Sequence, residues 1–231
     1  MQPLVLIPAR GGSKGIPHKN IIQLGNKPLI QYTVEEARKI FPDEYICVST
    51  DDLEIKSIVE NLGLPVPFLR PAELATDTCG TKEVILHAIK YYQDNNYNFD
   101  TFILLQATSP YRTAIHIQQA MDLFKEDPEC DLLISVQETK ANPYFTLFEE
   151  DNSGYLHKSK PEGNIVRRQD CPKVYEINGA IYIYKKDVVC LNDNWDKLRI
   201  RKYLMDKISS IDIDDEFDLL IAEFIYKIAK F

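Results

Sequence analysis

Residues 4–20, LVLIPARGGSKGIPHKN, join an apolar run directly to a basic, glycine-rich turn. The run Leu4–Pro8 has the length and composition of a buried strand. The glycines and the serine of the turn allow positive φ angles and leave backbone N–H groups uncovered. A buried strand followed by such a turn is typical of α/β sheets that bind ligands at the carboxyl ends of their strands.

Short apolar runs and longer amphipathic runs alternate along the rest of the chain. Such alternation predicts a mostly parallel sheet with helices on both faces, which is a three-layer α/β/α sandwich. The predicted strands are residues 4–8, 45–49, 66–69, 101–105, 131–136, 180–184 and 208–213. The predicted helices are residues 28–40, 52–62, 81–93, 114–124 and 216–230.

The segment 138–176 breaks this alternation. It is polar, contains several prolines and glycines, and offers one candidate hairpin, 145–149 with 154–157, around Asn152-Ser153-Gly154. A long excursion from a compact domain is usually functional, an interaction surface or disordered. The length of 231 residues fits one domain, 1–231, that carries this insertion.

The composition is that of an acidic globular protein. The chain has 27 Lys and Arg against 35 Asp and Glu, a net charge of −8, which disfavours non-specific nucleic-acid binding. We expect a cytoplasmic protein that crosses no membrane, because no run approaches the roughly 18 apolar residues of a span and the N-terminus lacks a signal-peptide pattern. The five cysteines are odd in number and include no Cys-x-x-Cys, so neither a disulfide framework nor a zinc site is indicated.

The first candidate site is the glycine-rich turn itself. Arg10, Lys14 and Lys19 place three cations within ten residues, beside uncovered N–H groups. This combination suits an anion with several charges, such as a triphosphate. The spacing matches neither the P-loop pattern nor the Gly-x-Gly-x-x-Gly pattern of dinucleotide binding. Phosphate binding is therefore favoured over a solvated basic turn.

Two further segments bring polar groups to the ends of predicted strands. In LQATSPYR, residues 105–112, Gln106 would place a carboxamide at the rim of the sheet. In SIDIDDEFD, residues 210–218, Asp212 and Asp214 share one face of a predicted strand because side chains alternate. Two adjacent carboxylates repel unless a cation lies between them, and Mg²⁺ is the natural cation beside a triphosphate. The acidic residues that follow favour the start of a helix instead.

Five segments together resemble the acylneuraminate cytidylyltransferase (CMP-N-acetylneuraminic acid synthetase) family. In order, they are IPARGGSKGIP with Lys19-Asn20, LRPAELA with Asp77, LQATSP with Arg112, NGAIYI at 178–183 and IDID at 211–214. The resemblance implies a fold like that of the nucleotide-diphospho-sugar transferases and a homodimer. In that dimer, residues 138–176 would contribute to the interface and reach into the neighbouring site.

The resemblance also implies a reaction, in which CTP gives CMP to the anomeric hydroxyl of a nine-carbon 2-keto sugar acid and pyrophosphate leaves. Arg10, Lys14, Lys19 and Asp214 would be the catalytic residues. Asp212 and Asp214 would hold Mg²⁺. The implied substrate-binding residues are Gly11, Ser13, Asn20, Arg70, Thr81, Gln106, Arg168 and Asn178.

Within that set, Gln106 and Asn178 would meet the sugar or the cytidine. Arg168 and its neighbour Arg167 are the candidates for contacting the sugar carboxylate across the dimer. Some family members carry basic residues where this chain has Phe145 and Glu176, which leaves the identity of the sugar acid open. N-acetylneuraminate comes first, with legionaminate, pseudaminate and Kdo as alternatives. A guanylyltransferase, a non-catalytic nucleotide-binding module and an NAD-dependent enzyme are the remaining alternatives.

Overall fold

A six-stranded sheet lies at the centre of the computed structural model, which describes residues 1–76, 78–161, 165, 167–191 and 195–229. Its strands, in spatial order, are β10 (Ile200–Leu204), β6 (Leu132–Glu138), β9 (Tyr175–Lys185), β5 (Thr101–Leu105), β1 (Pro3–Pro8) and β4 (Ile46–Ser49). Strand β9 runs antiparallel to both of its neighbours, and the other pairs in this sheet are parallel. The sheet is therefore mostly parallel, as predicted.

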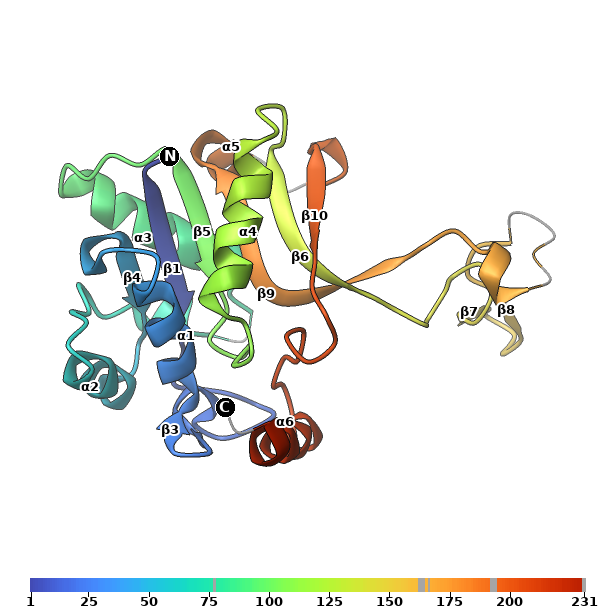
Figure 1. Cartoon of the computed structure of the whole chain (residues 1–231), viewed down its shortest axis with the longest axis horizontal. Helices are drawn as coiled ribbons and strands as arrows, with labels where there is room; N and C mark the ends of the chain where they lie inside the picture. Colours follow the sequence, from blue (N-terminus) through green and yellow to red (C-terminus); the bar gives the residue numbers. More distant parts are fainter. Residues whose placement is uncertain (77, 162–164, 166, 192–194, 230–231) are drawn as a thin grey trace.

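Helices cover both faces of this sheet (Figure 1). They are α1 (Leu29–Arg38), α2 (Leu53–Asn61), α3 (Thr81–Asp94), α4 (Ala114–Lys125), α5 (Lys186–Leu191) and α6 (Glu216–Ala229). Helices α1, α2 and α4 pack in a core on one face, and α3 packs in a separate core on the other. This arrangement confirms the predicted three-layer α/β/α sandwich. Among the described residues, no helix is long and apolar enough to cross a bilayer.

The two cores meet at β1, whose side chains alternate between the faces. Val5 and Ile7 belong to the core that includes α1, whereas Leu4 and Leu6 belong to the core that includes α3. These side chains are fully buried. A strand covered on both faces is apolar at successive positions, which explains why this run lacks polar alternation. The same double burial fixes the point at which the glycine-rich turn leaves the sheet.

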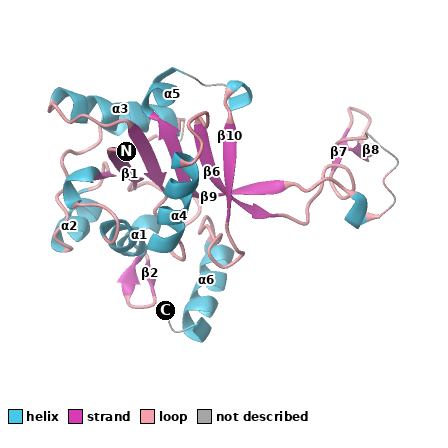
Figure 2. Ribbon diagram, turned by 45° about the horizontal axis from the view of Figure 1, so that its top comes forward, coloured by secondary structure: helices cyan, strands magenta, loops and turns pink. Residues whose placement is uncertain are grey.

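Residues 139–174, which we call the arm, leave the body between β6 and β9 (Figures 1 and 2). The predicted hairpin forms there as β7 (Phe148–Glu150) paired with β8 (Leu156–Lys158), slightly later in the sequence than predicted. Gly154, in the turn between these strands, has a φ of 83°, a conformation that favours glycine. The apolar side chains of Phe148, Tyr155 and Leu156 are exposed. The arm therefore presents apolar surface that the described part of the chain leaves uncovered.

Two of the predicted strands are wrong. Residues 208–213 form a turn and an extended loop, because the carboxylate of Asp206 accepts hydrogen bonds from the N–H groups of Ile208 and Ser209. Residues 66–69 contribute only an isolated bridge, between Leu69 and Thr50.

The sequence analysis did not predict β10, α5 or the pair of two-residue strands β2 (Gln23–Leu24) and β3 (Lys27–Pro28). The last strand of the sheet is β10, which lies at an edge and is mostly exposed. Its charged residues suit an edge position, and they interrupt the apolar run by which a strand is predicted from sequence. Helix α5 follows β9 directly and is too short to show a clear helical period.

Helix α6 holds the segment before it against the glycine-rich turn. Ala222 of α6 packs in one buried cluster with Ile16 of the turn and Ile213 of the preceding loop. The hydroxyl of Tyr111 donates to the carbonyl oxygen of Ala222 at 2.5 Å. These contacts hold residues 211–215, which we call the aspartate segment, beside the turn.

Candidate active site

A cavity of about 420 Å³, which we call the main cavity, opens at the carboxyl ends of β1 and β5. Pro8 ends β1, Gln106 directly follows β5, and both line the cavity. The predicted site residues in the lining are Arg10, Ser13, Lys19, Asn20, Arg70, Thr81, Gln106, Asp212 and Asp214. Residues from widely separated segments of the sequence therefore share one cavity.

The glycine-rich turn forms part of this cavity and is held by close contacts. Asn20 is buried, and its Nδ2 donates to the carbonyl oxygen of Arg10 at 2.9 Å. A Cβ on Gly15 would lie 2.2 Å from the backbone oxygen of Asp214. Glycine at this position therefore allows the turn to touch the aspartate segment.

The two carboxylates predicted to bind metal both line the main cavity. Nζ of Lys19 lies 2.7 Å from Oδ1 of Asp214, whose side chain is 72% exposed. Asp212 is partly buried, and burial together with repulsion from Asp214 raises the pKa of its carboxyl group. Among the described residues, no hydrogen-bond partner reaches its buried Oδ1. An unpartnered buried carboxylate oxygen beside a second carboxylate suits a divalent cation.

Asp212 and Asp214 do not complete a metal site on their own. In the part of the chain that the structure describes, no group of three or more His, Cys, Asp or Glu side chains is placed to hold a metal ion. Mg²⁺ prefers about six oxygen ligands and usually keeps waters and substrate phosphates among them. A cation at these aspartates would therefore need ligands from water and a bound substrate.

Arg70 and Arg10 add positive charge to the same cavity. Arg70 is buried, and its Nη2 lies 3.3 Å from Oδ1 of Asp51. Burial lowers the pKa of Arg70, and the Asp51 carboxylate partly offsets this effect. Oδ1 of Asp51 also accepts from the N–H of Gly11 at 3.1 Å, which ties Arg70 to the glycine-rich turn. The cavity thus combines cations that suit phosphates with carboxylates that suit a metal ion.

The N-terminus of α3 also meets the main cavity. Gly80 is the N-cap, Thr81 is the first helical residue, and both line the cavity. Gly80 has no side chain with which to cap the helix. Backbone N–H groups at a helix N-terminus attract anions, so this end adds donors for phosphate oxygens.

Arg112 is a structural residue of the site to which the sequence analysis assigned no role. Its side chain is fully buried. Nη1 donates to the carbonyl oxygens of Gln106 and Ala180, each at 2.9 Å, and Nη2 donates to Oγ1 of Thr33 at 2.6 Å. One guanidinium group therefore joins α1, β9 and the residue after β5. The feature of the sequence that could have indicated this role is the position of Arg112, a charged residue close to an apolar strand.

The remaining predicted residues lie outside the lining of the main cavity. Gly11 contributes its N–H to Asp51. Lys14 is exposed on the glycine-rich turn, and Arg168 is exposed on the arm. Asn178 is buried in β9. Asp77, which belongs to one of the quoted segments, lies outside the described residues.

A second cavity, of about 410 Å³, adjoins the main cavity, because Asp212 and Asp214 line both. Its lining is rich in carboxylates and also includes Glu176 and Asp218. Lys207 is the one cationic residue among the described residues of this lining.

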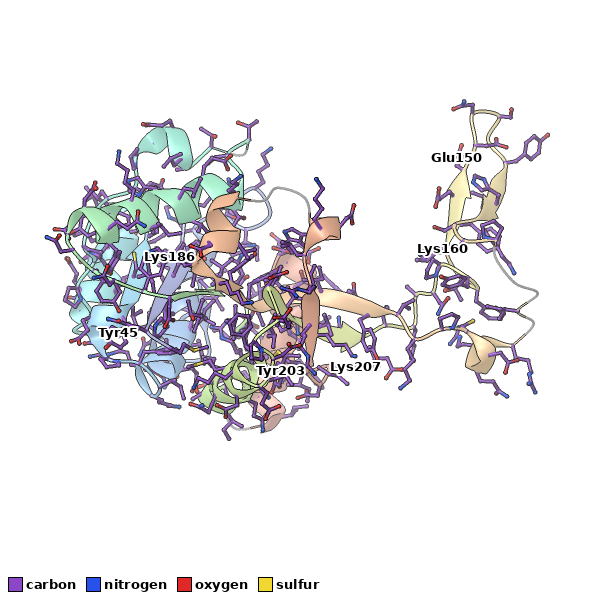
Figure 3. All side chains as sticks on the ribbon, turned by 90° about the horizontal axis from the view of Figure 1, so that it is seen from above. Tyr45, Glu150, Lys160, Lys186, Tyr203 and Lys207 are labelled. Carbon is purple, nitrogen blue, oxygen red and sulfur yellow. The ribbon has the colours of Figure 1, made fainter. Side chains whose placement is uncertain are left out.

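Lys207 also lines a pocket at the base of the arm, which we call the arm pocket. Figure 3 labels Lys207 close to the point where the arm leaves the body. Lys140, Arg168 and Lys173 share the arm pocket with a single carboxylate among its described residues, Glu138. A carboxylate-rich cavity and a cation-rich pocket therefore meet at Lys207.

Known proteins resemble this chain over most of its length. The Campylobacter coli protein named post-translational flagellin modification protein B is 36% identical over 97% of this chain and 94% of its own length. The CMP-N,N'-diacetyllegionaminic acid synthase of Campylobacter jejuni is 36% identical over 96% of this chain and 94% of its own length. The N-acylneuraminate cytidylyltransferase of Escherichia coli is 36% identical over 95% of this chain, which spans 51% of that relative's length.

The fold is also shared with a solved structure. A CMP:2-keto-3-deoxy-manno-octonic acid synthetase complexed with CTP matches with a TM-score of 0.72 and 17% identity, over 98% of this chain and 99% of that one. A family model described as cytidylyltransferase matches residues 4–220, which include the glycine-rich turn and both aspartates. The chain therefore belongs to the cytidylyltransferase family and is a nucleotidyltransferase.

Proposed function

We propose that this protein transfers CMP from CTP to the anomeric hydroxyl of N-acetylneuraminate or a related nine-carbon 2-keto sugar acid, with release of pyrophosphate in the cytoplasm. The observation that carries the proposal is the contact between the glycine-rich turn and the aspartate segment, in which Lys19 lies 2.7 Å from Asp214. Relatives named for N-acylneuraminic and legionaminic acids support the class of sugar acid.

In this proposal the main cavity holds CTP. Arg10, Arg70 and Lys19 bring positive charge to the triphosphate, and the N-terminus of α3 adds N–H donors. The sugar hydroxyl attacks the α-phosphorus, and the bond from that phosphorus to the pyrophosphate oxygen breaks. Reactions of this type depend on positioning and charge neutralisation, so they need no nucleophile from the protein.

Asp212 and Asp214 hold Mg²⁺ in the proposed enzyme. The unpartnered Oδ1 of Asp212 and the closeness of the two carboxylates support this assignment. A bound divalent cation supplies neutralisation of phosphate charge. When CTP binds, the ammonium group of Lys19 leaves Asp214 and contacts a phosphate oxygen instead.

The sugar acid occupies the second cavity, next to the same aspartates. Its carboxylate is attached to the carbon that bears the attacking hydroxyl, so it must enter a region rich in negative charge. Lys207 and the other cations of the arm pocket, including Arg168, supply the positive charge that this carboxylate needs.

We also propose a homodimer in which each arm packs on the partner. The exposed face of α6 carries Phe217, Leu220 and Phe224, each more than 60% exposed. The arm exposes Tyr155 and Leu156 and points away from the body of its own chain (Figure 1). A second copy can cover both apolar surfaces through one two-fold axis.

Light scattering on single variants tests this dimer. Leu156→Asp on the arm and Phe224→Asp on α6 should each shift the wild-type mass from dimer toward monomer. Ile115→Asp is the matched control, because Ile115 is 66% exposed on α4 and belongs to neither surface. A monomeric wild type, or dimers in both test variants, would contradict the proposal.

Pyrophosphate release tests the reaction itself. The protein is incubated with Mg²⁺, with CTP or GTP, and with one of N-acetylneuraminate, legionaminate, pseudaminate or Kdo. We expect release with CTP and a nine-carbon acid, fastest with N-acetylneuraminate, and no release with GTP. Release with Kdo alone would contradict the nine-carbon substrate. CTP binding without release from any pair would instead support a non-catalytic nucleotide-binding module.

A further inference from the structure

Asn178 lies at an irregularity in the central sheet. The pairing of β9 with β6 shifts its register between Ile134 and Val136, where Asn178 and Gly179 lie on β9. Gly179 has a φ of 75°, a conformation that favours glycine. Irregularities of this kind redirect side chains out of the regular alternation. Here the redirected side chain is an amide that is only 4% exposed.

The amide of Asn178 uses its hydrogen-bonding capacity inside the protein. Its Oδ1 accepts from Oγ of Ser135 at 2.6 Å and from the N–H of Ala180 at 3.2 Å. Its Nδ2 donates to Oγ of Ser210 at 2.9 Å and to Sδ of Met205 at 3.4 Å. A backbone N–H can only donate, so the atom that faces Ala180 is the oxygen. Asn178 lines the second cavity, but its two amide donors and two lone pairs are engaged inside the protein, so the amide has no free hydrogen-bonding group for a substrate.

Ser210 connects this amide to the aspartate segment. It precedes Asp212 by two positions in a loop without strand pairing. The N–H of Ile213 donates to the carbonyl oxygen of Thr108 at 2.9 Å, so the loop is held on both sides of Asp212. A Cβ on Gly179 would lie 3.2 Å from Oδ2 of Asp212. The irregularity in β9 therefore anchors the loop and also leaves room for its carboxylate.

We propose that Asn178 is a positioning residue, which sets the place of the Asp212 carboxylate by holding Ser210 and does not itself contact the substrate. The inference rests on the proposed function, because that function makes Asp212 a metal ligand. It departs from the contact with sugar or cytidine that the family resemblance implied for Asn178. The two roles predict different kinetics, since a substrate contact changes KM and a displaced metal ligand changes metal affinity and kcat.

Two variants separate these roles. Asn178→Ser shortens the side chain, and Ser210→Ala leaves Asn178 in place while removing its link to the loop. The matched control is Ser209→Ala, because Ser209 is equally buried but its Oγ donates to Asp206 at 2.7 Å. The first measurement is calorimetric titration of Mg²⁺ into protein saturated with CTP. The second is steady-state kinetics with the best sugar acid.

We expect Asn178→Ser and Ser210→Ala to raise the dissociation constant of Mg²⁺ about tenfold and to lower kcat by a similar factor. KM for the sugar acid should stay within about twofold of wild type. Ser209→Ala should stay within about twofold in every measurement. The double variant should be no worse than the more impaired single variant, because both changes break one link.

A tenfold rise in KM for the sugar acid in Asn178→Ser, with Ser210→Ala unchanged from wild type, would overturn the inference. Failure of the proposed function has a different signature, namely wild-type protein that binds no Mg²⁺ in the presence of CTP. In that case, hydrogen exchange at the amide of Ile213 tests the positioning. Faster exchange in Ser210→Ala than in Ser209→Ala supports it, and equal exchange overturns it.

Discussion

Nζ of Lys19 lies 2.7 Å from Oδ1 of Asp214, although 195 residues separate them in the sequence. The lysine side chain is 14% exposed and the aspartate side chain 72% exposed, so the pair reaches from the wall of the main cavity to solvent. In the proposed enzyme, phosphate oxygens and the aspartate compete for this one ammonium group. The ion pair therefore links nucleotide binding to the availability of Asp214.

Asp214→Asn should lower turnover more than it weakens CTP binding. The amide keeps the shape of the side chain but loses the charge that attracts a divalent cation, so kcat should fall about a hundredfold. Pyrophosphate release and CTP titration measure the two effects. Asp215→Asn is the control: Asp215 accepts the N–H groups of Phe217 and Asp218 at the start of α6, and asparagine caps equally well. Undiminished release by Asp214→Asn would contradict the metal assignment.

Gly15→Ala should damage the site through backbone position alone. Its Cβ would lie 2.2 Å from the backbone oxygen of Asp214, so the glycine-rich turn and the aspartate segment must move apart. A displacement of this size should lower kcat/KM for CTP about a hundredfold. Gly12→Ala is the matched control, because a Cβ there meets nothing within 4 Å. Equal activity of the two variants in the pyrophosphate assay would show that the contact does not matter.

Arg112→Met should destabilise the fold strongly. It removes the donor from the buried carbonyl oxygens of Gln106 and Ala180, and each stranded acceptor costs about 1–3 kcal/mol. The free energy of unfolding in urea should therefore fall by about 3 kcal/mol. Arg38→Met is the control, since Arg38 pairs with Asp43 and donates to the carbonyl oxygen of Leu62 at the surface, where water can replace both contacts. It should cost less than about 1 kcal/mol. Similar losses for both variants would refute the structural role of Arg112.

His116 should make stability depend on pH. Burial lowers the pKa of this imidazole, and its Nδ1 accepts from the N–H of Thr113 at 3.1 Å, which requires the neutral ring. The unfolded chain takes up the proton near pH 6.5 and the folded protein at lower pH, so the unfolded state binds more protons in between. The free energy of unfolding should therefore decrease as the pH falls from about 7 through the folded pKa.

His116→Gln isolates this effect. Glutamine three residues after Thr113 preserves a capping box without a titrating group. Urea unfolding across this pH range should show a flatter profile in the variant than in the wild type. Superimposable profiles would show that His116 does not cause the pH dependence of the free energy of unfolding.

Much of the fold could be predicted because it depends on local patterns. The run Leu4–Pro8 is apolar at successive positions because both faces of β1 are covered, and the length of that run is visible in the sequence. The alternating Ile and Asp of 211–214 indicated a strand, but hydrogen bonds to Asp206 form a turn just before it and no neighbouring strand pairs with it. Strand β10 was missed because its edge position tolerates charged residues.

Sequence patterns alone were sufficient to establish the α/β layers and the cationic glycine-rich turn, and they predicted Asp212 and Asp214 as partners of a cation. Each depends on residue types and spacings within a short segment. The role of Arg112, the full engagement of Asn178 and the contact between Lys19 and Asp214 emerged from the folded chain. These features join segments far apart in sequence, and hydrogen bonds and burial arise only when folding brings such segments together.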